Sequence, residues 1–324
     1  MRIFEISEND SGQRLDKFIT KAMPLFPKSL MYKAIRTKKI KVNKKRAEIG
    51  QMLNVGDIVH VFVKEEFFQT VDDEFYKNIK PVFKIVYEDD NIIVADKPVG
   101  LLCHSDQKEE KNTLIEQIKA YLWKKGEYDE SEENSFSPAL CNRIDRNTAG
   151  LVIAAKNAAS LRSMNTIVKD RLVDKYYLCL LQNMPKEKEG TIEGYIVKDS
   201  TNNMVKVFKD RPNNRDAKKA ITKYKVLSKS EDGVLCEVEL VTGRTHQIRA
   251  QMAFIGCPLV GEGKYSVKGK EKAVGMKSQA LWAYKLKFKN DLPKPLDYLS
   301  GKNISIALED IPFACAIMLK KKKA

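Results

Sequence analysis

An acid-rich segment at residues 64–80 divides this chain into two parts of different character. The part before it is short and basic, whereas the part after it alternates apolar runs of strand type with helical patterns. A chain of 324 residues is long enough to build two hydrophobic cores. The sequence therefore predicts a small module at 1–63, a linker at 64–80, a main domain at 81–318 and a basic tail at 319–324.

The first part has the pattern of two helices followed by short strands. Apolar residues recur at helical spacing over 15–22 and 31–35, and Ser29 is placed to cap the second helix. The segment KKIKVNKKR and the alternating residues 58–62 predict short strands joined by turns. We therefore expect a small α/β unit.

This module is strongly basic in its second half. Residues 28–46 include nine Lys or Arg and no acidic residue, in a chain whose formal net charge is +15. A solvated helix usually mixes both signs of charge, so this run predicts a surface that binds a polyanion. The residues expected to contact phosphates are Lys28, Lys33, Arg36, Lys38, Lys39, Lys44, Lys45 and Arg46.

The segments RLDKFI, FPKSLMYKAIRTKKIKVN and VGDIVHVF resemble, in this order, the small alpha-L RNA-binding module. That module is shared by a ribosomal protein, tyrosyl-tRNA synthetases and several RNA-modifying enzymes. The resemblance covers about residues 12–63 and implies that the polyanion is RNA.

From residue 81 onward, strand and helix patterns alternate and predict an α+β domain. A hairpin is expected around the turn at 88–91, and the acidic segment 126–134 is expected to be a surface loop. Further strands are expected at 151–155, 176–181 and 233–241, and helices at 158–169 and 247–254.

Three polar segments beside these strands carry the candidate chemistry. NRIDRNTAG precedes an apolar strand, KYY places a phenol beside a cation, and GRTHQIR spans a turn from strand to helix. Taken singly, each has an ordinary explanation, because Asp145 could cap a turn and Tyr177 could fill the core of a sheet. Their combination is the informative signal.

Together with DKPVGLLCH at 96–104, these segments resemble the RluA-type pseudouridine synthase family in order and spacing, from Val82 to near the end of the chain. The arrangement with a basic module in front is that of members acting on large-subunit (23S) ribosomal RNA. The resemblance implies an isomerase built on a largely antiparallel mixed β-sheet flanked by helices and loops. It also implies ribosomal RNA as the partner, and neither a cofactor nor a metal.

The resemblance assigns roles to matched positions. Asp145 aligns with the catalytic aspartate, Arg143 with the arginine that takes the place of a flipped base, and Tyr177 with the stacking tyrosine. Arg249 matches the arginine that pairs with the aspartate, and Ile248 is expected to pack on the other face of the base.

The chain departs from the family pattern at three positions. It has Asn142 where the family usually has His, Ile144 where it usually has Leu, and Glu262 where it usually has Asp. None of these changes removes a charge that the chemistry requires.

Elementary chemistry agrees with these roles. The reaction breaks the glycosidic bond of uridine and rejoins the same sugar carbon, C1′, to C5 of the uracil. It therefore needs an anion near C1′ and a pocket that retains the detached base. Asp145 supplies the anion, either by attacking the sugar or by abstracting a sugar proton, and the sequence favours neither route. A stacked uridine must first be extruded, at a cost of a few kcal/mol.

Other features exclude competing classes. The six cysteines form no C-x-x-C pair and there are only three histidines, so neither disulfides nor a metal site is expected. The glycine-rich segment 256–264 lacks the Gly-Lys-Ser/Thr ending of a nucleotide-binding loop. A charged N-terminus and short apolar runs favour a cytoplasmic, membrane-free protein, and a monomer is expected.

Two alternatives stay open. One is an RNA-binding or ribosome-assembly factor without turnover, against which the intact set of Asp145, Tyr177 and Arg249 argues. The other is a synthase that acts on transfer RNA. The identity of the target uridine depends on RNA shape and is not encoded in a short motif.

Overall fold

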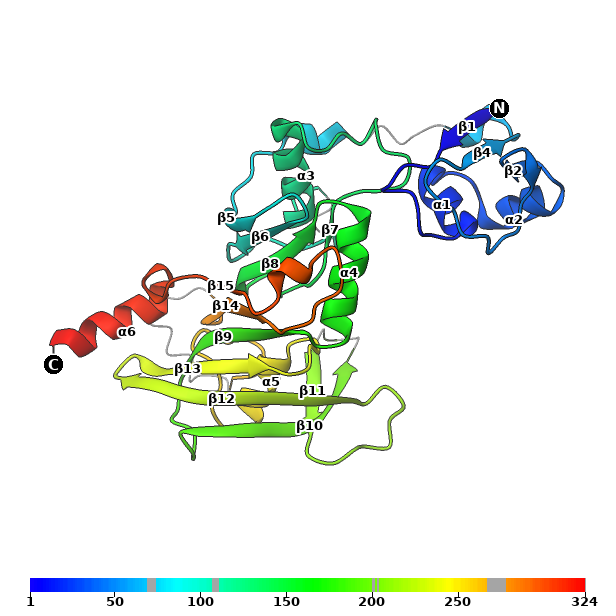
Figure 1. Cartoon of the computed structure of the whole chain (residues 1–324). Helices are drawn as coiled ribbons and strands as arrows, with labels where there is room; N and C mark the ends of the chain where they lie inside the picture. Colours follow the sequence, from blue (N-terminus) through cyan, green and yellow to red (C-terminus); the bar gives the residue numbers. More distant parts are fainter. Residues whose placement is uncertain (69–73, 107–110, 200–201, 203, 267–277, 324) are drawn as a thin grey trace.

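The computed structural model describes residues 1–68, 74–106, 111–199, 202, 204–266 and 278–323. It consists of a small N-terminal module beside a larger body built on one extended β-sheet (Figure 1). None of the described helices is long and apolar enough to cross a membrane.

The N-terminal module packs two helices on a four-stranded antiparallel sheet in the order β1-β4-β2-β3. Its elements are β1 (Arg2–Glu5), α1 (Leu15–Ala22), α2 (Lys28–Arg36), β2 (Ile40–Val42), β3 (Lys45–Arg46) and β4 (Ile58–Val61). The apolar faces of both helices are buried, as their spacing predicts. Strand β1 was not anticipated, because it is completed by pairing with β4, which follows more than fifty residues later.

The predicted cap of the second helix is wrong. Helix α2 begins at Lys28, and Pro27 rather than Ser29 occupies the N-cap position, so Ser29 lies inside the first turn. Proline suits a helix start because its fixed φ fits there and it has no N–H group to leave unpaired.

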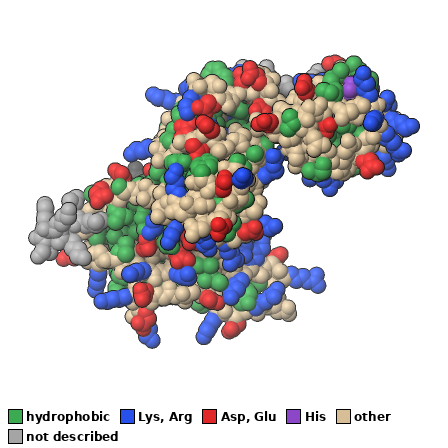
Figure 2. Space-filling model, viewed as in Figure 1, with side chains coloured by type: hydrophobic (Ala, Val, Ile, Leu, Met, Phe, Trp, Pro, Cys, Tyr) green, Lys and Arg blue, Asp and Glu red, His purple; other side chains and the backbone are tan. Residues whose placement is uncertain are grey.

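The eight basic residues predicted to bind RNA all have exposed side chains on this module. Figure 2 shows blue Lys and Arg side chains along the outer edge of the module. In the part of the chain that the structure describes, none of the eight forms an ion pair with a carboxylate. The positive charge is therefore available to a ligand.

The main body is an eleven-stranded sheet in the order β11-β10-β12-β13-β9-β14-β8-β6-β5, with β15 paired to β14 and β7 to β8. The β14–β8 pair is parallel, and the other pairs in the described chain are antiparallel, so the predicted fold class is confirmed. The strands are β5 (Lys84–Glu88), β6 (Ile92–Lys97), β7 (Ala139–Leu140), β8 (Ala149–Ala155), β9 (Val173–Leu181), β10 (Glu189–Asp199), β11 (Met204–Phe208), β12 (Lys218–Ser230), β13 (Gly233–Leu240), β14 (Leu281–Phe288) and β15 (Asn303–Ser305).

Helices cover both faces of this sheet. They are α3 (Leu114–Lys125), α4 (Ala158–Lys169), α5 (Gln247–Phe254) and α6 (Pro312–Lys323). Alternate residues of β8 enter opposite cores: Val152 lies in the core with α3 and α5, and Ile153 in the core with α4 and α6. Burial on both faces explains why β8 is an uninterrupted apolar run.

The segment predicted as a linker contains regular structure. It contains two short 3-10 helices, η1 (Glu65–Phe68) and η2 (Glu74–Asn78), in which Phe68 and Tyr76 are buried. Residues 69–73 lie outside the described residues. The predicted tail is continuous with α6 as far as Lys323. The domain boundaries themselves stay a prediction.

Candidate active site

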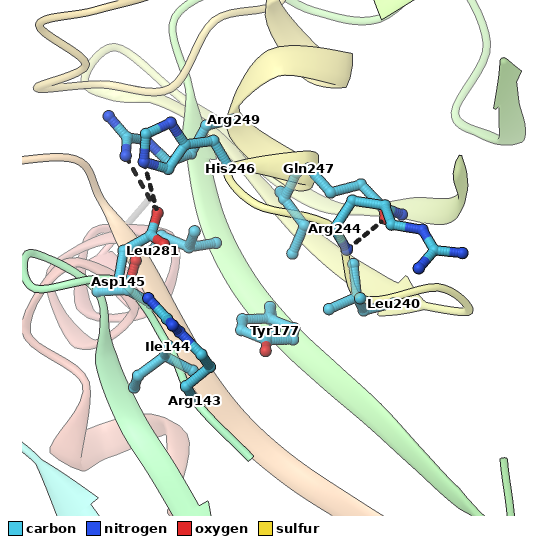
Figure 3. Close-up of a pocket in the computed structure, with 13 residues that line it drawn as sticks. Arg143, Ile144, Asp145, Tyr177, Leu240, Arg244, His246, Gln247, Arg249 and Leu281 are labelled. Carbon is cyan, nitrogen blue, oxygen red and sulfur yellow. Dashed lines mark hydrogen bonds and ion pairs between the residues drawn. The ribbon is translucent and has the colours of Figure 1, made fainter. Parts of the chain in front are cut away.

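The five residues predicted to form the site line one cavity that is open to solvent. Arg143 and Asp145 come from the loop before β8, Tyr177 from β9 and Arg249 from α5 (Figure 3). Ile248 also belongs to α5. They are brought together because β8 and β9 both pair with β14 while α5 packs on the same face.

Asp145 presents its carboxylate at the wall of this cavity. Its Oδ2 accepts a hydrogen bond from Arg249 Nη1 at 3.1 Å, and His246 Nε2 lies 3.7 Å away (Figure 3). The side chain is 28% exposed, so a ligand in the cavity can reach the carboxylate. The guanidinium fixes its direction through a charge-assisted hydrogen bond.

Arg249 is held from its other side by Glu262. Glu262 accepts hydrogen bonds from Nε and Nη2 of Arg249, both at 2.7 Å, and its side chain has no exposed surface. Burial acts to raise the pKa of Glu262, but hydrogen bonding and the charge of Arg249 outweigh burial and hold that pKa below its ordinary value. The sequence marked Glu262 only as a departure from the family pattern, and its role as a partner of Arg249 was missed.

His246 and Tyr265 lie beside the Asp145–Arg249–Glu262 group. His246 Nδ1 lies 2.8 Å from the Tyr265 hydroxyl, and the Arg249 guanidinium lies 5.5 Å from the centre of the Tyr265 ring. Burial lowers the pKa of His246, although Asp145 acts to raise it, so the imidazole is neutral near pH 7. His246 therefore acts as a hydrogen-bonding residue in this arrangement.

The loop that carries Asp145 is fastened by a buried lysine that sequence reasoning missed. Lys97 has no exposed surface, and its Nζ donates to the backbone carbonyls of Pro98, Leu101 and Arg146 at 3.0, 2.7 and 3.0 Å. Burial lowers the pKa of Lys97 to about 8. The sequence signal was a lysine directly after the apolar strand IIVAD, where burial of a charge requires partners.

Three further hydrogen bonds hold the same loop. The Cys103 thiol donates to the carbonyl of Ile144 at 3.4 Å, and the N–H of Thr148 donates to the carbonyl of Asp145 at 3.0 Å. Asn142, which stands where the family usually has His, accepts a hydrogen bond from the N–H of Ile153 at 2.8 Å. The departure at Asn142 therefore ties the loop to β8.

Tyr177 and Arg143 differ in how firmly they are held. Tyr177 is buried, and burial, followed by Asp145 and Cys103, raises the pKa of its hydroxyl, so the phenol stays protonated at neutral pH. Arg143 is exposed and has no hydrogen bond or ion pair with the described residues. Tyr177 can thus offer a fixed ring, whereas Arg143 can change position.

Helix α5 is anchored by two glutamines that the sequence did not single out. Gln247 accepts from the Thr242 hydroxyl at 2.8 Å and donates to that of Thr222 at 2.9 Å. Gln251 accepts from the same Thr222 hydroxyl at 2.7 Å. This buried network sets the position of α5 against β12 and thereby the position of Arg249.

No group of three or more metal-ligating side chains occurs among the described residues.

Comparisons with known proteins identify the family of this chain. The family described as RNA pseudouridylate synthase matches residues 91–254, and the S4 domain family matches residues 13–59. The chain therefore belongs to the RNA pseudouridine synthases, and it is an RNA-modifying isomerase with an N-terminal S4 domain. The family and the enzyme class expected from the sequence are confirmed.

Individual relatives give the same result. An uncharacterized RNA pseudouridine synthase of Mycoplasma capricolum subsp. capricolum is 35% identical over 307 residues, which cover 94% of this chain and 97% of that protein. The ribosomal large subunit pseudouridine synthase C of Vibrio parahaemolyticus is 29% identical, covering 82% and 80%. Among solved structures, human RNA pseudouridylate synthase domain containing 1 shares the fold with a TM-score of 0.51 at 22% identity, covering 74% of this chain and 98% of that chain.

Proposed function

We propose that this enzyme isomerises specific uridines of large-subunit ribosomal RNA and that Asp145 is its catalytic residue. The observation that carries the proposal is the Asp145 carboxylate, held by Arg249 at the wall of a cavity that Tyr177 and Arg143 also line. The basic S4 domain and the name of the Vibrio relative support ribosomal RNA as the substrate.

The target uridine enters the cavity only after it leaves the RNA stack. Exposed Arg143 lies at the cavity and is free to occupy the vacated space. The Tyr177 ring and the Ile248 side chain then hold the uracil between two flat or apolar surfaces. These contacts keep the detached base in place while it turns.

The reaction exchanges one bond for another. The N1–C1′ bond breaks, a C5–C1′ bond forms, a proton leaves C5 and N1 gains one, so the product is an isomer. Asp145 acts at the sugar, either by adding to C1′ or by removing a ribose proton, and both routes need an ionised carboxylate of fixed direction. Arg249 supplies that direction.

A neighbouring hollow suits the RNA on either side of the target. It shares Gly243 and Arg244 with the active-site cavity, and Lys198 and Lys218 also line it. Asp216 also lines this hollow, so its three cations outnumber one carboxylate. A net positive charge beside an RNA-modifying cavity favours contacts with the phosphates that flank the flipped nucleotide.

The test measures release of tritium from RNA labelled at C5 of uridine. We expect the wild-type protein to release tritium from large-subunit ribosomal RNA. Asp145→Asn should lower release on the order of 10⁴-fold or more while RNA binding is retained. Turnover by Asp145→Asn contradicts the catalytic role, and binding without release by the wild type indicates an RNA-binding factor. Release from transfer RNA alone contradicts the ribosomal substrate.

A further inference from the structure

A fully buried carboxylate, Asp10, lies where the N-terminal module meets the main body. Its Oδ1 accepts a hydrogen bond from the Ser135 hydroxyl at 2.6 Å, and its Oδ2 accepts one from Asn134 Nδ2 at 2.8 Å. The Ser7 hydroxyl, from the module itself, also donates to Oδ2 at 2.9 Å. Asp10 therefore joins the module to the loop that precedes β7.

Further hydrogen bonds surround this contact on both sides. Gln13 Nε2 donates to the Ser135 hydroxyl at 2.9 Å, and Asn9 Nδ2 donates to Glu133 Oε1 at 2.8 Å. Helix α4 takes part as well, because the N–H of Ala158 donates to Asn9 Oδ1 at 3.1 Å. We call the set Asn9, Asp10, Gln13, Glu133, Asn134, Ser135 and Ala158 the interdomain latch.

The sequence pattern assigned residues 126–134 to a surface loop, yet the end of this loop is what the module docks on. Figure 1 shows the loop running from the main body to the base of the module, beside α1. A buried carboxylate is stable only when its oxygens are paired, and the donors of Asn134 and Ser135 are supplied by the other domain. In the docked geometry both oxygens of the buried carboxylate are therefore paired, so its burial at the junction leaves no hydrogen bond unmade.

The latch also brings basic side chains of the two domains together. Arg162 of α4 donates to the carbonyl of Ser11 at 3.1 Å, and Lys21 of α1 donates to Gln13 Oε1 at 3.1 Å. Burial and the charge of Arg162 lower the pKa of Lys21, and the charge of Asp10 opposes them. Two like charges held across a junction attract an anion, and a phosphate backbone that passes from the module to the main body would provide it.

We propose that the interdomain latch is a specificity device and that Asp10, Asn134 and Ser135 are its positioning residues. With the S4 domain docked, its basic surface stands at a fixed distance and angle from Asp145. The enzyme then modifies only uridines that lie at the matching offset from the RNA element bound by the S4 domain. This inference rests on the proposed function, because it takes RNA binding by the module as given.

The experiment uses the full chain with two latch variants, Asp10→Asn on the module and Asn134→Ala/Ser135→Ala on the main body. The matched control is Ser131→Ala, which alters an exposed residue of the same loop whose side chain hydrogen-bonds, among the described residues, to Asp129 alone. Each protein is assayed on the intact ribosomal RNA and on a short hairpin that contains the target uridine without the segment bound by the module.

We expect both latch variants to match wild type and Ser131→Ala on the hairpin. On the intact RNA they should lose about tenfold or more in kcat/KM at the normal uridine, with new pseudouridines at neighbouring positions. Small-angle scattering should show a larger radius of gyration for the variants, because the module is no longer docked.

A wild-type modification pattern in both latch variants overturns the proposal. So does an equal loss on hairpin and intact RNA, since that result means damage to the catalytic domain. Failure of the proposed function itself looks different, because the wild-type protein would then release no tritium from either RNA.

Discussion

Glu262 binds two nitrogens of Arg249 and leaves the third, Nη1, directed at Asp145. The two hydrogen bonds to Glu262 are 2.7 Å long, and the one to Asp145 is 3.1 Å long. The guanidinium is therefore held more tightly by Glu262 than by Asp145. Two hydrogen bonds from one edge of a planar guanidinium to the same carboxylate prevent the guanidinium from rotating. The direction of the Asp145 carboxylate is therefore set by a residue that does not line the cavity.

Glu262→Gln should weaken both stability and turnover. The substitution leaves the Arg249 guanidinium buried beside a neutral amide, and breaking a buried pair in this way costs roughly 3 kcal/mol or more. Urea unfolding measures the loss, and tritium release should fall because Arg249 no longer holds Asp145. Glu262→Asp, which keeps the charge, should lose less stability and less turnover. A Glu262→Gln variant as stable and active as wild type contradicts the role of Glu262 as the residue that holds Arg249.

Acid titration gives an independent check on Glu262. Its pKa is lowered in the native protein, so its stabilising contribution is complete above the ordinary glutamate pKa of about 4.5 and is lost as the pH falls through the lower native value. The stability of the wild type should therefore drop more steeply below pH 4.5 than that of Glu262→Gln. Parallel curves for the two proteins would contradict the depressed pKa.

Lys97 predicts a pH dependence of the opposite kind. Its native pKa is lowered from 10.5 to about 8, so between these values the unfolded chain binds a proton that the native protein has released. Stability relative to Lys97→Met should therefore rise with pH across this window, by up to roughly 3 kcal/mol. Urea unfolding from pH 7 to 10.5 measures the difference, and a constant difference refutes the lowered pKa.

Arg143→Ala should affect catalysis without affecting stability. Arg143 is exposed and forms no hydrogen bond or ion pair with the described residues, so the melting temperature should stay unchanged. If Arg143 fills the space left by the base, its removal should lower turnover on a structured RNA by about 10- to 100-fold. Turnover of an unstructured oligonucleotide, in which the uridine is already unstacked, should fall much less. An equal fall in turnover on both RNAs contradicts the displacement role.

Gly150→Ala should destabilise the main sheet. Gly150 has φ +113°, and a Cβ there would lie 2.1 Å from the backbone oxygen of Ala283, its partner across the parallel β8–β14 pair. Relief requires the two strands to separate, so we expect a loss of roughly 3 kcal/mol or more. Gly263→Ala is the control, since its Cβ meets nothing within 4 Å, and equal melting temperatures for the two variants would contradict the steric argument.

Local patterns were enough to find much of the fold. Helices at 158–169 and 247–254 have the bounds that apolar spacing predicts, and the strands at 151–155 and 176–181 lie within β8 and β9. The long strands β10 and β12 were not anticipated, because glycines interrupt the apolar alternation of β10 and the buried Thr222 interrupts that of β12. Both strands also take partners from each other. Strand β1 escaped for the same reason, since its pairing with β4 depends on a distant segment.

The sequence by itself singled out the residues that we propose to carry the chemistry. Asp145, Arg143, Tyr177 and Arg249 are recognised from short motifs, because a reaction constrains residue types at fixed spacing within a segment. Their meeting was implied only by resemblance, since Arg249 and Asp145 are 104 positions apart.

The tertiary structure alone decided how those residues are supported. In the sequence, nothing distinguishes Lys97, Glu262 and Asp10 from other charged residues. In the structure, Lys97 donates to three carbonyls, Glu262 accepts from Arg249 and Asp10 accepts from Ser135. Each acquires its role only through burial and through a partner that folding brings near, as with Asp10 and Ser135, which are 125 positions apart. Burial makes an unpaired charge costly, and that cost depends on contacts that no local pattern contains.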